Sequence, residues 1–221
     1  MPEPSAADWG DRYLQRLTPW DLGRAHPELV SRIESLGPPG RAVVPGAGYG
    51  HDARALADAG WRVTAIEFVP DLERDLGEAV GWAGDVVIGD ALQWTPREPV
   101  DLVFDHTFFC AIPLRRRPEF GPWAESVLRE GGTVASAVFP IGRSPRGGGP
   151  PFAMSAFDLA DALGPRFDLV TETEARQPRG RSWPTRWAEF VRMPDSFVSP
   201  TGLRYLADAA ATRSRPGRRW P

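Results

Sequence analysis

A glycine-rich turn between two short apolar runs constrains the fold of this 221-residue chain more than any other feature. Residues 41–52 read RAVVPGAGYGHD, where an apolar run breaks into glycines 46, 48 and 50 before a helical pattern begins. A second apolar run, 62–67, ends on Glu67. Strand, glycine loop, helix, strand and acid in this order form the first half of a doubly wound nucleotide-binding fold. Without a Cβ, glycine lets the backbone approach a ligand closely.

The glycine spacing indicates which nucleoside cofactor the loop binds. A dinucleotide fingerprint, G-x-G-x-x-G, needs its third glycine at position 51, which is His51. The pattern G-x-G-x-G after Pro45 instead resembles motif I of methyltransferases that use S-adenosylmethionine (SAM). Glu67 is then placed to accept hydrogen bonds from both ribose hydroxyls. The sequence favours SAM, with an NAD(P)-binding oxidoreductase and a non-catalytic SAM-binding regulator as alternative classes.

Predicted strands alternate with predicted helices along the chain. We expect strands at about 41–45, 62–67, 85–88, 100–106, 133–139, 167–173 and 187–193, and helices at about 26–36, 51–59, 71–80, 117–129 and 155–163. This alternation predicts a parallel sheet covered on both faces, and the last two strands, with no helix between them, predict an antiparallel edge. The expected fold class is α/β, a doubly wound, Rossmann-like, seven-stranded sheet as in class I SAM-dependent methyltransferases.

Three segments are expected along this fold. Residues 1–24 are predicted to form an N-terminal aromatic lid, 25–194 the methyltransferase domain, and 195–221 a disordered tail.

Composition and charge exclude several classes of function. The net charge of −3 gives no basic footprint for nucleic acid, and the apolar runs are shorter than the ~20 residues that span a bilayer. The N-terminus lacks the regions of a signal peptide, and one cysteine, Cys110, rules out an intramolecular disulfide framework. No spacing of His, Cys, Asp or Glu indicates a metal. We expect a cytoplasmic monomer that acts on a small molecule.

Several sequence blocks carry a family resemblance. They are Trp9, Tyr13 and Trp20 with TPWDLGRAHP, RAVVPGAGYGHD, AIE at 65–67, GDALQW at 89–94, FDHTFFCAIPLRRRPEF at 104–120 and FPIGRSPRGGGPPF at 139–152. Over about residues 9–155 the chain resembles the thiopurine S-methyltransferase superfamily, and within it the halide and thiol methyltransferases. The resemblance implies methyl transfer from SAM to a small soft nucleophile: a thiol, bisulfide, thiocyanate or halide. Methylation of a larger aromatic thiol, or of an oxygen or nitrogen acceptor, is the alternative.

The same resemblance implies a cofactor site. Its expected SAM contacts are Trp9, Tyr13, Trp20, Gly46, Gly48, Glu67, Asp90, Ala91 and His106. Aromatic faces attract a cation by about 0.5–2 kcal/mol each, so the three N-terminal rings could cage the sulfonium. Each assignment has an alternative: the rings could plug a sheet edge, Glu67 could be a solvated strand end, and Asp90 could cap a helix.

The methyl-transfer site is expected at His106 and Phe139, with Phe109, Phe139 and Phe152 lining the substrate pocket. Histidine titrates in the physiological range, so His106 is the candidate base. Plant halide and thiol enzymes have tyrosine at the positions of His106 and Phe139, and these departures leave the acceptor open. Core packing is the alternative for each phenylalanine, and Phe108 is as plausible a lining residue as Phe109.

The remaining polar candidates are expected to be structural. Arg115–Arg117 is a run of charge, predicted to be solvated unless one arginine meets an anionic substrate or the SAM carboxylate. Cys110 is predicted to be a small buried hydrophobe. His51 is placed in the loop-to-helix turn, and His26 on the surface.

Overall fold

One seven-stranded sheet organises the computed structural model, which describes residues 3–81, 84–144, 148–179 and 183–196. The strand order is β3-β2-β1-β4-β5-β7-β6. The strands are β1 (Arg41–Pro45), β2 (Arg62–Glu67), β3 (Gly84–Ile88), β4 (Val100–His106), β5 (Leu128–Val138), β6 (Phe167–Glu174) and β7 (Arg186–Arg192). Strands β1 to β5 are parallel, and β7 runs antiparallel to both β5 and β6. The doubly wound sheet and its antiparallel edge were therefore predicted correctly.

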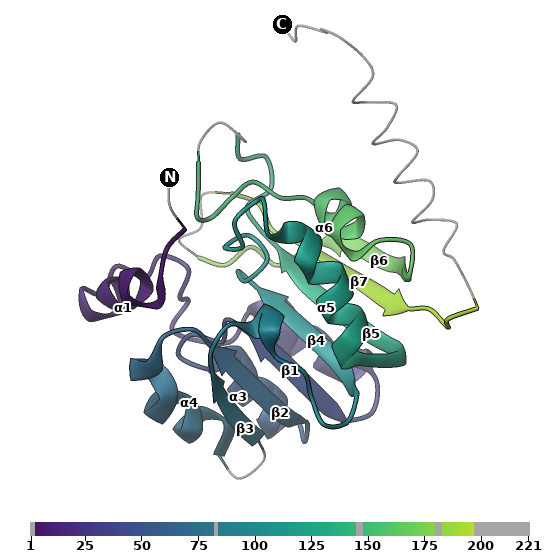
Figure 1. Cartoon of the computed structure of the whole chain (residues 1–221), viewed down its shortest axis with the longest axis horizontal. Helices are drawn as coiled ribbons and strands as arrows, with labels where there is room; N and C mark the ends of the chain where they lie inside the picture. The colour runs from purple at the N-terminus through teal and green to yellow at the C-terminus, as the bar shows by residue number, and fades with distance from the viewer. Residues whose placement is uncertain (1–2, 82–83, 145–147, 180–182, 197–221) are drawn as a thin grey trace, which may run out of the picture.

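Helices cover both faces of the sheet (Figure 1). They are α1 (Ala6–Leu14), α2 (Pro27–Arg32), α3 (His51–Asp58), α4 (Glu73–Val80), α5 (Phe120–Val127) and α6 (Ala156–Leu163), with short 3-10 segments η1 (Ile33–Leu36), η2 (Pro70–Leu72), η4 (Ala91–Gln93) and η5 (Arg117–Glu119). Helices α2, α3 and α4 bury their apolar residues in one hydrophobic core, and α5 and α6 bury theirs in the other. Each face of the sheet is thereby covered by a separate core.

The fifth strand begins earlier than the sequence indicated. Residues 130–132, Glu-Gly-Gly, were expected to close a helix, but β5 already begins at Leu128. Its pairing with β4 shifts register between Val100 and Leu102, and Gly131 adopts a φ of 72°. A bulge of this kind absorbs the glycine pair without ending the strand, because glycine adopts a positive φ at little cost.

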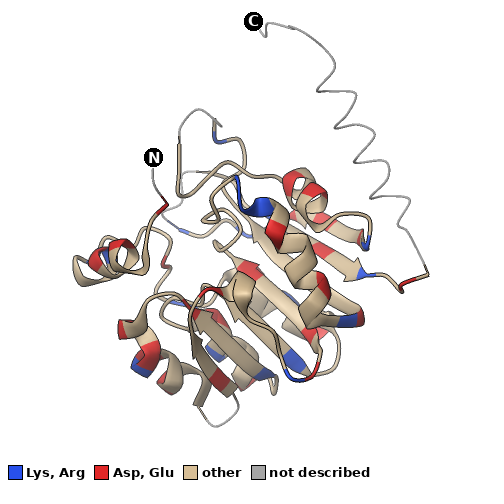
Figure 2. Ribbon diagram, viewed as in Figure 1, with Lys and Arg blue, Asp and Glu red and all other residues tan. Residues whose placement is uncertain are grey.

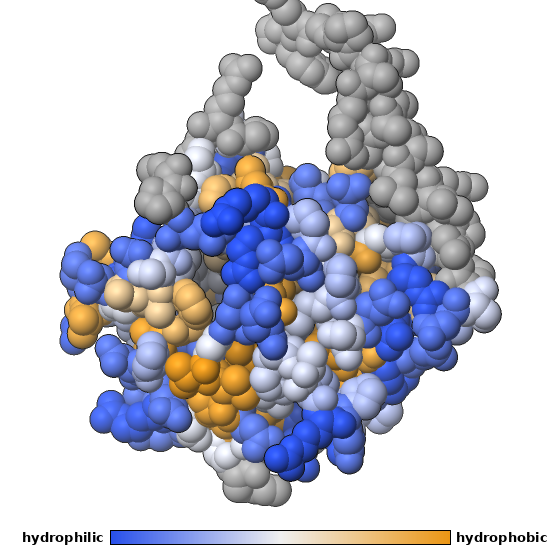
Figure 3. Space-filling view, viewed as in Figure 1, coloured by the Kyte–Doolittle hydropathy of each residue, from blue (hydrophilic) through white to orange (hydrophobic). Residues whose placement is uncertain are grey.

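Only the 3-10 segment η4 lies between β3 and β4, where a doubly wound fold usually has a helix. The side chains of edge strand β3 are accordingly only partly buried, with Asp85 exposed. In the space-filling view, hydrophobic residues gather over the region labelled β2 and β3 in Figure 1 (Figure 3). Charged residues of both signs are interspersed over the rest of the fold (Figure 2).

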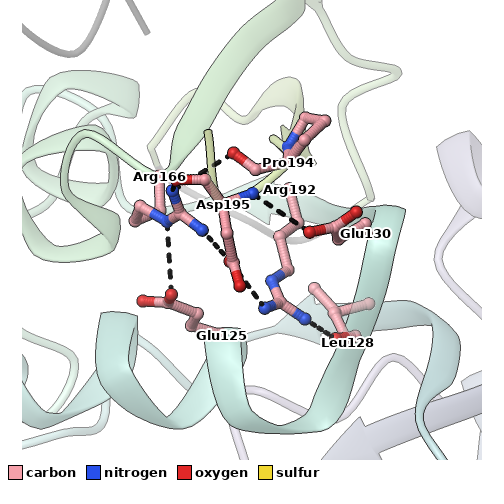
Figure 4. Close-up of polar contacts among 7 residues, drawn as sticks. All are labelled: Glu125, Leu128, Glu130, Arg166, Arg192, Pro194 and Asp195. Carbon is pink, nitrogen blue, oxygen red and sulfur yellow. Dashed lines mark hydrogen bonds and ion pairs between the residues drawn. The ribbon is translucent and has the colours of Figure 1, made fainter. Parts of the chain in front are cut away.

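An ionic cluster of Glu125, Glu130, Arg166, Arg192 and Asp195 closes the amino end of β5 (Figure 4). Arg166 contacts Glu125 at 3.3 Å and also pairs with Asp195. The backbone amide of Asp195 donates to Glu130 at 3.0 Å. These contacts fasten the end of β7 to α5 and β5.

Within the described ranges, no helix is both long and apolar enough to cross a bilayer.

Candidate functional site

A cavity of about 360 Å³ lies at the carboxyl edge of the sheet. Strand β1 is flanked there by β2 on one side and β4 on the other, which is the switch point where doubly wound folds bind ligands. The cavity brings together most of the predicted site residues: Trp9, Tyr13, Trp20, Gly46, Glu67, Asp90, Ala91 and Phe139. It does not bring in Gly48, His106, Phe109 or Phe152.

Glu67 ends β2 with its carboxylate buried and firmly held. One oxygen accepts the backbone N–H of Phe68 at 2.8 Å and of Val69 at 3.0 Å, and the other accepts the N–H of Gly48 at 2.8 Å. Burial raises the pKa of Glu67, and the three amide donors oppose that rise. The result is a fixed acceptor on the cavity wall, with one of its roughly four lone pairs, on Oε2, left for a ligand hydroxyl.

The glycine loop between β1 and α3 has glycine at three positions of positive φ, one of which, Gly50 at 79°, precedes α3 and packs against Ala79. Gly46 and Gly48 have φ values of 61° and 56°, a region that side chains other than glycine rarely adopt. A Cβ on Gly46 would lie 3.0 Å from the ring of Phe108, and one on Gly48 would lie 3.1 Å from the hydroxyl oxygen of Tyr13. Gly46 lines the cavity, whereas Gly48 contributes its N–H to Glu67.

Three rings from the N-terminal segment form one aromatic cluster at the cavity. The centroid of Trp20 lies 5.2 Å from that of Trp9 and 5.6 Å from that of Tyr13, both in edge-on contact. The Trp20 indole N–H donates to the Tyr13 hydroxyl at 3.2 Å. Burial, with the nearby charge of Glu67, raises the pKa of Tyr13, so its ring stays neutral.

Asp90 follows β3 and has two structural partners besides facing the cavity. Its carboxylate accepts the N–H of Leu92 at 3.0 Å, as the cap of η4, and pairs with Arg116 at 2.8 Å. Capping and cavity lining therefore coexist at this residue.

The predicted run of arginines divides into three environments. Arg116 lines the cavity, and its hydrogen bonds to Glu119 and Asp90 raise its pKa. Arg115 is exposed and contacts Glu3 at 2.8 Å. Arg117 is buried over the ring of Phe109, 4.5 Å from its centroid, and donates to the carbonyl of Ala153 at 3.0 Å. The expectation of a solvated run is wrong for Arg116 and Arg117.

The turn after β4 explains why Phe108, and not Phe109, lines the cavity. One oxygen of buried Asp105 accepts the N–H groups of Phe108 and Phe109, and the other accepts the Ser136 hydroxyl at 2.7 Å. Thr107 within this turn has a φ of 68°, which is strained for a β-branched residue. The turn directs Phe108 into the cavity, while Phe109 is fully buried against Phe120.

His106 faces a smaller cavity, of about 40 Å³, together with Gly48 and Asp52. Its Nδ1 lies 2.6 Å from an oxygen of Asp52, whose other oxygen accepts the N–H of His26 at 2.7 Å. The two histidine rings meet edge-on at 4.8 Å. His26 is fully buried and accepts the N–H of Glu28 at the start of α2, so its expected surface position is wrong. Asp52 joins the glycine loop to the end of β4.

The larger cavity also has a set of apolar lining residues. They include Phe108, Cys110, Phe139, Pro150, Pro151 and Trp183. The buried Cys110 thiol donates to the Thr107 carbonyl at 3.3 Å, as expected of a small buried residue. Phe152 lies outside the lining because its backbone bonds to the Cys110 carbonyl and its ring packs on Gly149.

Comparison with known proteins identifies the family that this geometry belongs to. The model of the thiopurine S-methyltransferase family matches residues 5–190. The chain belongs to the thiopurine S-methyltransferase family. It is 35% identical over 173 residues to a probable thiol methyltransferase 2 of Arabidopsis thaliana, with 75% of each chain covered. It is 24% identical to a thiopurine S-methyltransferase of Legionella pneumophila, covering 69% of this chain and 77% of that one.

Solved structures agree with this membership at the level of fold. The Burkholderia thailandensis 1,6-didemethyltoxoflavin-N1-methyltransferase, solved with S-adenosylhomocysteine, superposes with a TM-score of 0.69 at 19% identity, covering 86% of this chain and 87% of that one. A TehB-like SAM-dependent methyltransferase of Corynebacterium glutamicum gives 0.60 at 16% identity, covering 85% and 97%. This family member is thus a SAM-dependent methyltransferase with the class I fold, and the NAD(P) alternative is excluded.

The residues of this methyltransferase suit its cofactor. Glu67 is a fixed acceptor suited to a ribose hydroxyl, and Trp9, Tyr13 and Trp20 line the same cavity, where aromatic rings suit a sulfonium cation. No group of three or more His, Cys, Asp or Glu in the described part of the chain is arranged to hold a metal ion.

Sequence reasoning did not single out Trp183, and it left Phe108 and Arg116 undecided, although all three line the cavity of the methyltransferase. Arg116 and Phe108 lay in blocks already recognised, but their direction depends on the turn at Asp105 and on the pairing with Asp90. Trp183 lay outside every recognised block, and no local signal pointed to it. Its partner Phe139 is distant in sequence, and only the pairing of β7 with β5 brings them together.

Proposed function

We propose that this methyltransferase transfers the methyl group of SAM to a small soft nucleophile, namely a thiol, bisulfide, thiocyanate or halide, by in-line displacement. The observation that carries the proposal is one cavity whose lining combines hydrogen-bonding groups with apolar side chains. We assign Glu67 and Asp90 to a cofactor end, and Phe108 and Phe139 to an acceptor end. Relatives named thiol methyltransferase and thiocyanate methyltransferase support it, the latter at 32% identity over 163 residues, 71% of each chain.

The proposed role of the cofactor end is to bind SAM and to orient its methyl group. When bound, SAM supplies an electrophilic methyl group on a sulfonium centre. Glu67 would accept a ribose hydroxyl, Asp90 and Ala91 would hold the adenine, and Trp9, Tyr13 and Trp20 would lie near the sulfonium charge. We further propose that the segment ending near residue 24 is a lid, since its three rings complete this wall.

The acceptor end excludes water from an anionic nucleophile. Apolar side chains surround the space where a nucleophile must lie within about 3–3.5 Å of the methyl carbon. Reaction of an anion with a sulfonium cancels charge, so a dry wall favours the transition state over the separated ions.

The lining offers no ready base to deprotonate an acceptor. Among the described residues, each lining carboxylate is already paired: Glu3 with Arg115, Glu67 with backbone amides and Asp90 with Arg116. Neither histidine nor lysine lines this cavity, and His106 is turned toward Asp52. We infer that the acceptor reacts as a preformed anion and that His106 is a positioning residue.

Headspace gas chromatography of purified protein with SAM tests the proposal. Iodide, thiocyanate, bisulfide and thiophenol are supplied separately, with the Glu67→Ala variant as the control. A methylated product above that control supports the proposed acceptor class. Intact SAM binding without product from any of the four would overturn it and would favour an oxygen or nitrogen acceptor.

A further inference from the structure

Trp183 is the one lining residue contributed by the turn between β6 and β7 among those the structure describes. Its ring lies beside Phe139, with the centroids 6.3 Å apart in edge-on contact. It is partly buried and packs against the same hydrophobic core as Phe139. The indole therefore forms a wall of the acceptor end, directly beside the residue that follows β5.

The backbone around Trp183 is fixed by hydrogen bonds. The Gln177 side-chain amide donates to the Trp183 carbonyl at 2.7 Å, and its oxygen accepts the N–H of Thr185 at 3.1 Å. The N–H of Ile141 donates to the carbonyl of Pro184 at 3.2 Å. A wall held at both ends of its turn yields little to a bulky ligand, because packed side chains resist overpacking.

The side chain of Trp183 is also tied to the loop that follows β5. The Arg143 guanidinium carbon lies 5.0 Å from its ring centroid, a cation–π arrangement. The same loop carries Pro150 and Pro151, which line the cavity. Trp183 thus contacts Arg143, which follows β5, and shares the cavity lining with Pro150 and Pro151.

We propose that Trp183 is the specificity-determining residue for acceptor size: its indole excludes fused aromatic thiols and keeps the site for small nucleophiles. The inference rests on the proposed function, because it names the size class accepted at that same site. One methylene of wall is worth about 10–200-fold in discrimination, so removing an entire indole should change selectivity by at least about tenfold.

The test compares the wild type with Trp183→Ala in two assays. The first measures kcat/KM with SAM for bisulfide and for 2-naphthalenethiol. The second measures, by calorimetry, the Kd of 2-naphthalenethiol for protein loaded with S-adenosylhomocysteine. We expect the naphthalenethiol-to-bisulfide ratio of kcat/KM to rise about tenfold or more in the variant, and its Kd for naphthalenethiol to fall similarly. The Kd for S-adenosylhomocysteine should stay within about twofold.

Two further variants keep the test falsifiable. Trp94→Ala removes a tryptophan that packs on the same core without lining the cavity, and it should leave the ratio unchanged. Trp183→Phe retains an aromatic ring and should give a naphthalenethiol-to-bisulfide ratio between those of the wild type and Trp183→Ala. It serves as the test variant if Trp183→Ala does not fold. Equal binding of naphthalenethiol by the wild type and the Trp183 variants, or the same shift in Trp94→Ala, would overturn the inference.

Failure of the proposed function has a different signature. A wild type that methylates no nucleophile contradicts the acceptor class, while the calorimetric comparison still decides the role of Trp183. Even if no nucleophile is methylated, tighter binding of naphthalenethiol to Trp183→Ala than to the wild type supports the role of Trp183 in excluding bulky thiols. Equal binding contradicts that role.

Discussion

Glu67 and Phe139 stand at the carboxyl ends of parallel strands and are almost equally buried, with 6% and 7% of their surface exposed, yet they are fixed by different means. Three backbone amides hold Glu67, whereas packing against core residues and the edge of Trp183 holds Phe139. Directional bonds define the cofactor half of the cavity, and volume defines the acceptor half. Substitutions should accordingly change cofactor affinity in one half and acceptor selectivity in the other.

The largest effect is expected outside both halves, at Asp52, which lines the smaller cavity and joins the glycine loop to the end of β4. Asp52→Ala leaves His106 and the N–H of His26 without their buried partner. Leaving a buried polar group without its hydrogen-bond partner costs about 1–3 kcal/mol, and two groups lose theirs here, so the free energy of unfolding should fall by about that amount for each in urea titrations. Asp52→Asn retains hydrogen-bonding capacity and should lose less. Equal stability of the wild type and the alanine variant would show that the junction is not structural.

Asp52 should also make the free energy of unfolding depend on pH. Burial would raise the pKa of Asp52, but the charge and hydrogen bond of His106 outweigh it and hold that pKa below the ordinary value. The stabilisation is therefore complete above the ordinary aspartate pKa of about 3.9 and is lost as pH falls through the lowered folded value. Urea titrations below about pH 4 should show a steeper loss of stability for the wild type than for Asp52→Asn.

The next largest effect is expected from substitution of Glu67, which should weaken cofactor binding without changing acceptor selectivity. Glu67→Ala removes a charged acceptor and should weaken SAM binding by about 1–3 kcal/mol, measured by calorimetry. The ratio of rates between thiocyanate and thiophenol should remain unchanged. Glu172→Ala is the matched control, since Glu172 lies on β6 and pairs with Arg186. An unchanged SAM Kd in Glu67→Ala would remove Glu67 from the site.

The pH dependence of kcat/KM tests whether the acceptor reacts as an anion. If the acceptor must arrive as an anion, kcat/KM for an alkyl thiol should fall about tenfold per pH unit below the thiol pKa, while thiocyanate shows no such slope. His106→Gln should leave both slopes in place. Loss of the thiol slope in that variant would instead identify His106 as a base.

Protonation of Glu67 should also lower activity at acid pH, and to the same degree for every acceptor. Because burial raises its pKa, SAM binding should weaken as pH falls toward that value. This pH dependence should be absent in Glu67→Gln, whose SAM affinity is followed by calorimetry across the same pH range.

The smallest effect is expected in the ionic cluster at the opposite end of β5. Arg166→Ala breaks contacts with Glu125 and with the largely exposed Asp195. Pairs of this kind are worth about 1 kcal/mol or less, so stability should change little. SAM affinity and the naphthalenethiol-to-bisulfide ratio should both equal those of the wild type. A change in either quantity would show that the two ends of the sheet are coupled.

Those parts of the site that follow local sequence rules were predictable. A glycine loop after β1, an acid ending β2 and an aspartate after β3 each depend on a few consecutive residues, and all three reach the cavity. The strands were predicted within a few residues for the same reason, except where a bulge extends β5 back to Leu128.

The acceptor half was not predictable in this way because its side-chain directions are set by tertiary contacts. Phe108 and Phe109 are chemically identical neighbours, and only the strained Thr107 turn, held by Asp105, decides which one faces the cavity. Phe152 packs on Gly149 and does not line the cavity, whereas Pro150 and Pro151 do. Burial of His26 and Arg117 likewise depends on partners distant in sequence, Asp52 and Ala153. The predicted tail beyond residue 196 lies outside the described residues.

The N-terminal helix has a consequence for the timing of turnover. In α1 only Gly10 is buried, against Val69, while the neighbouring Leu14 and Leu17 are largely exposed. A helix with so little buried surface opens locally at low free-energy cost, yet its rings cover the cofactor end of the cavity. If α1 is part of the proposed lid, its opening would gate exchange of the cofactor, and release of the spent cofactor beneath it would set the turnover number.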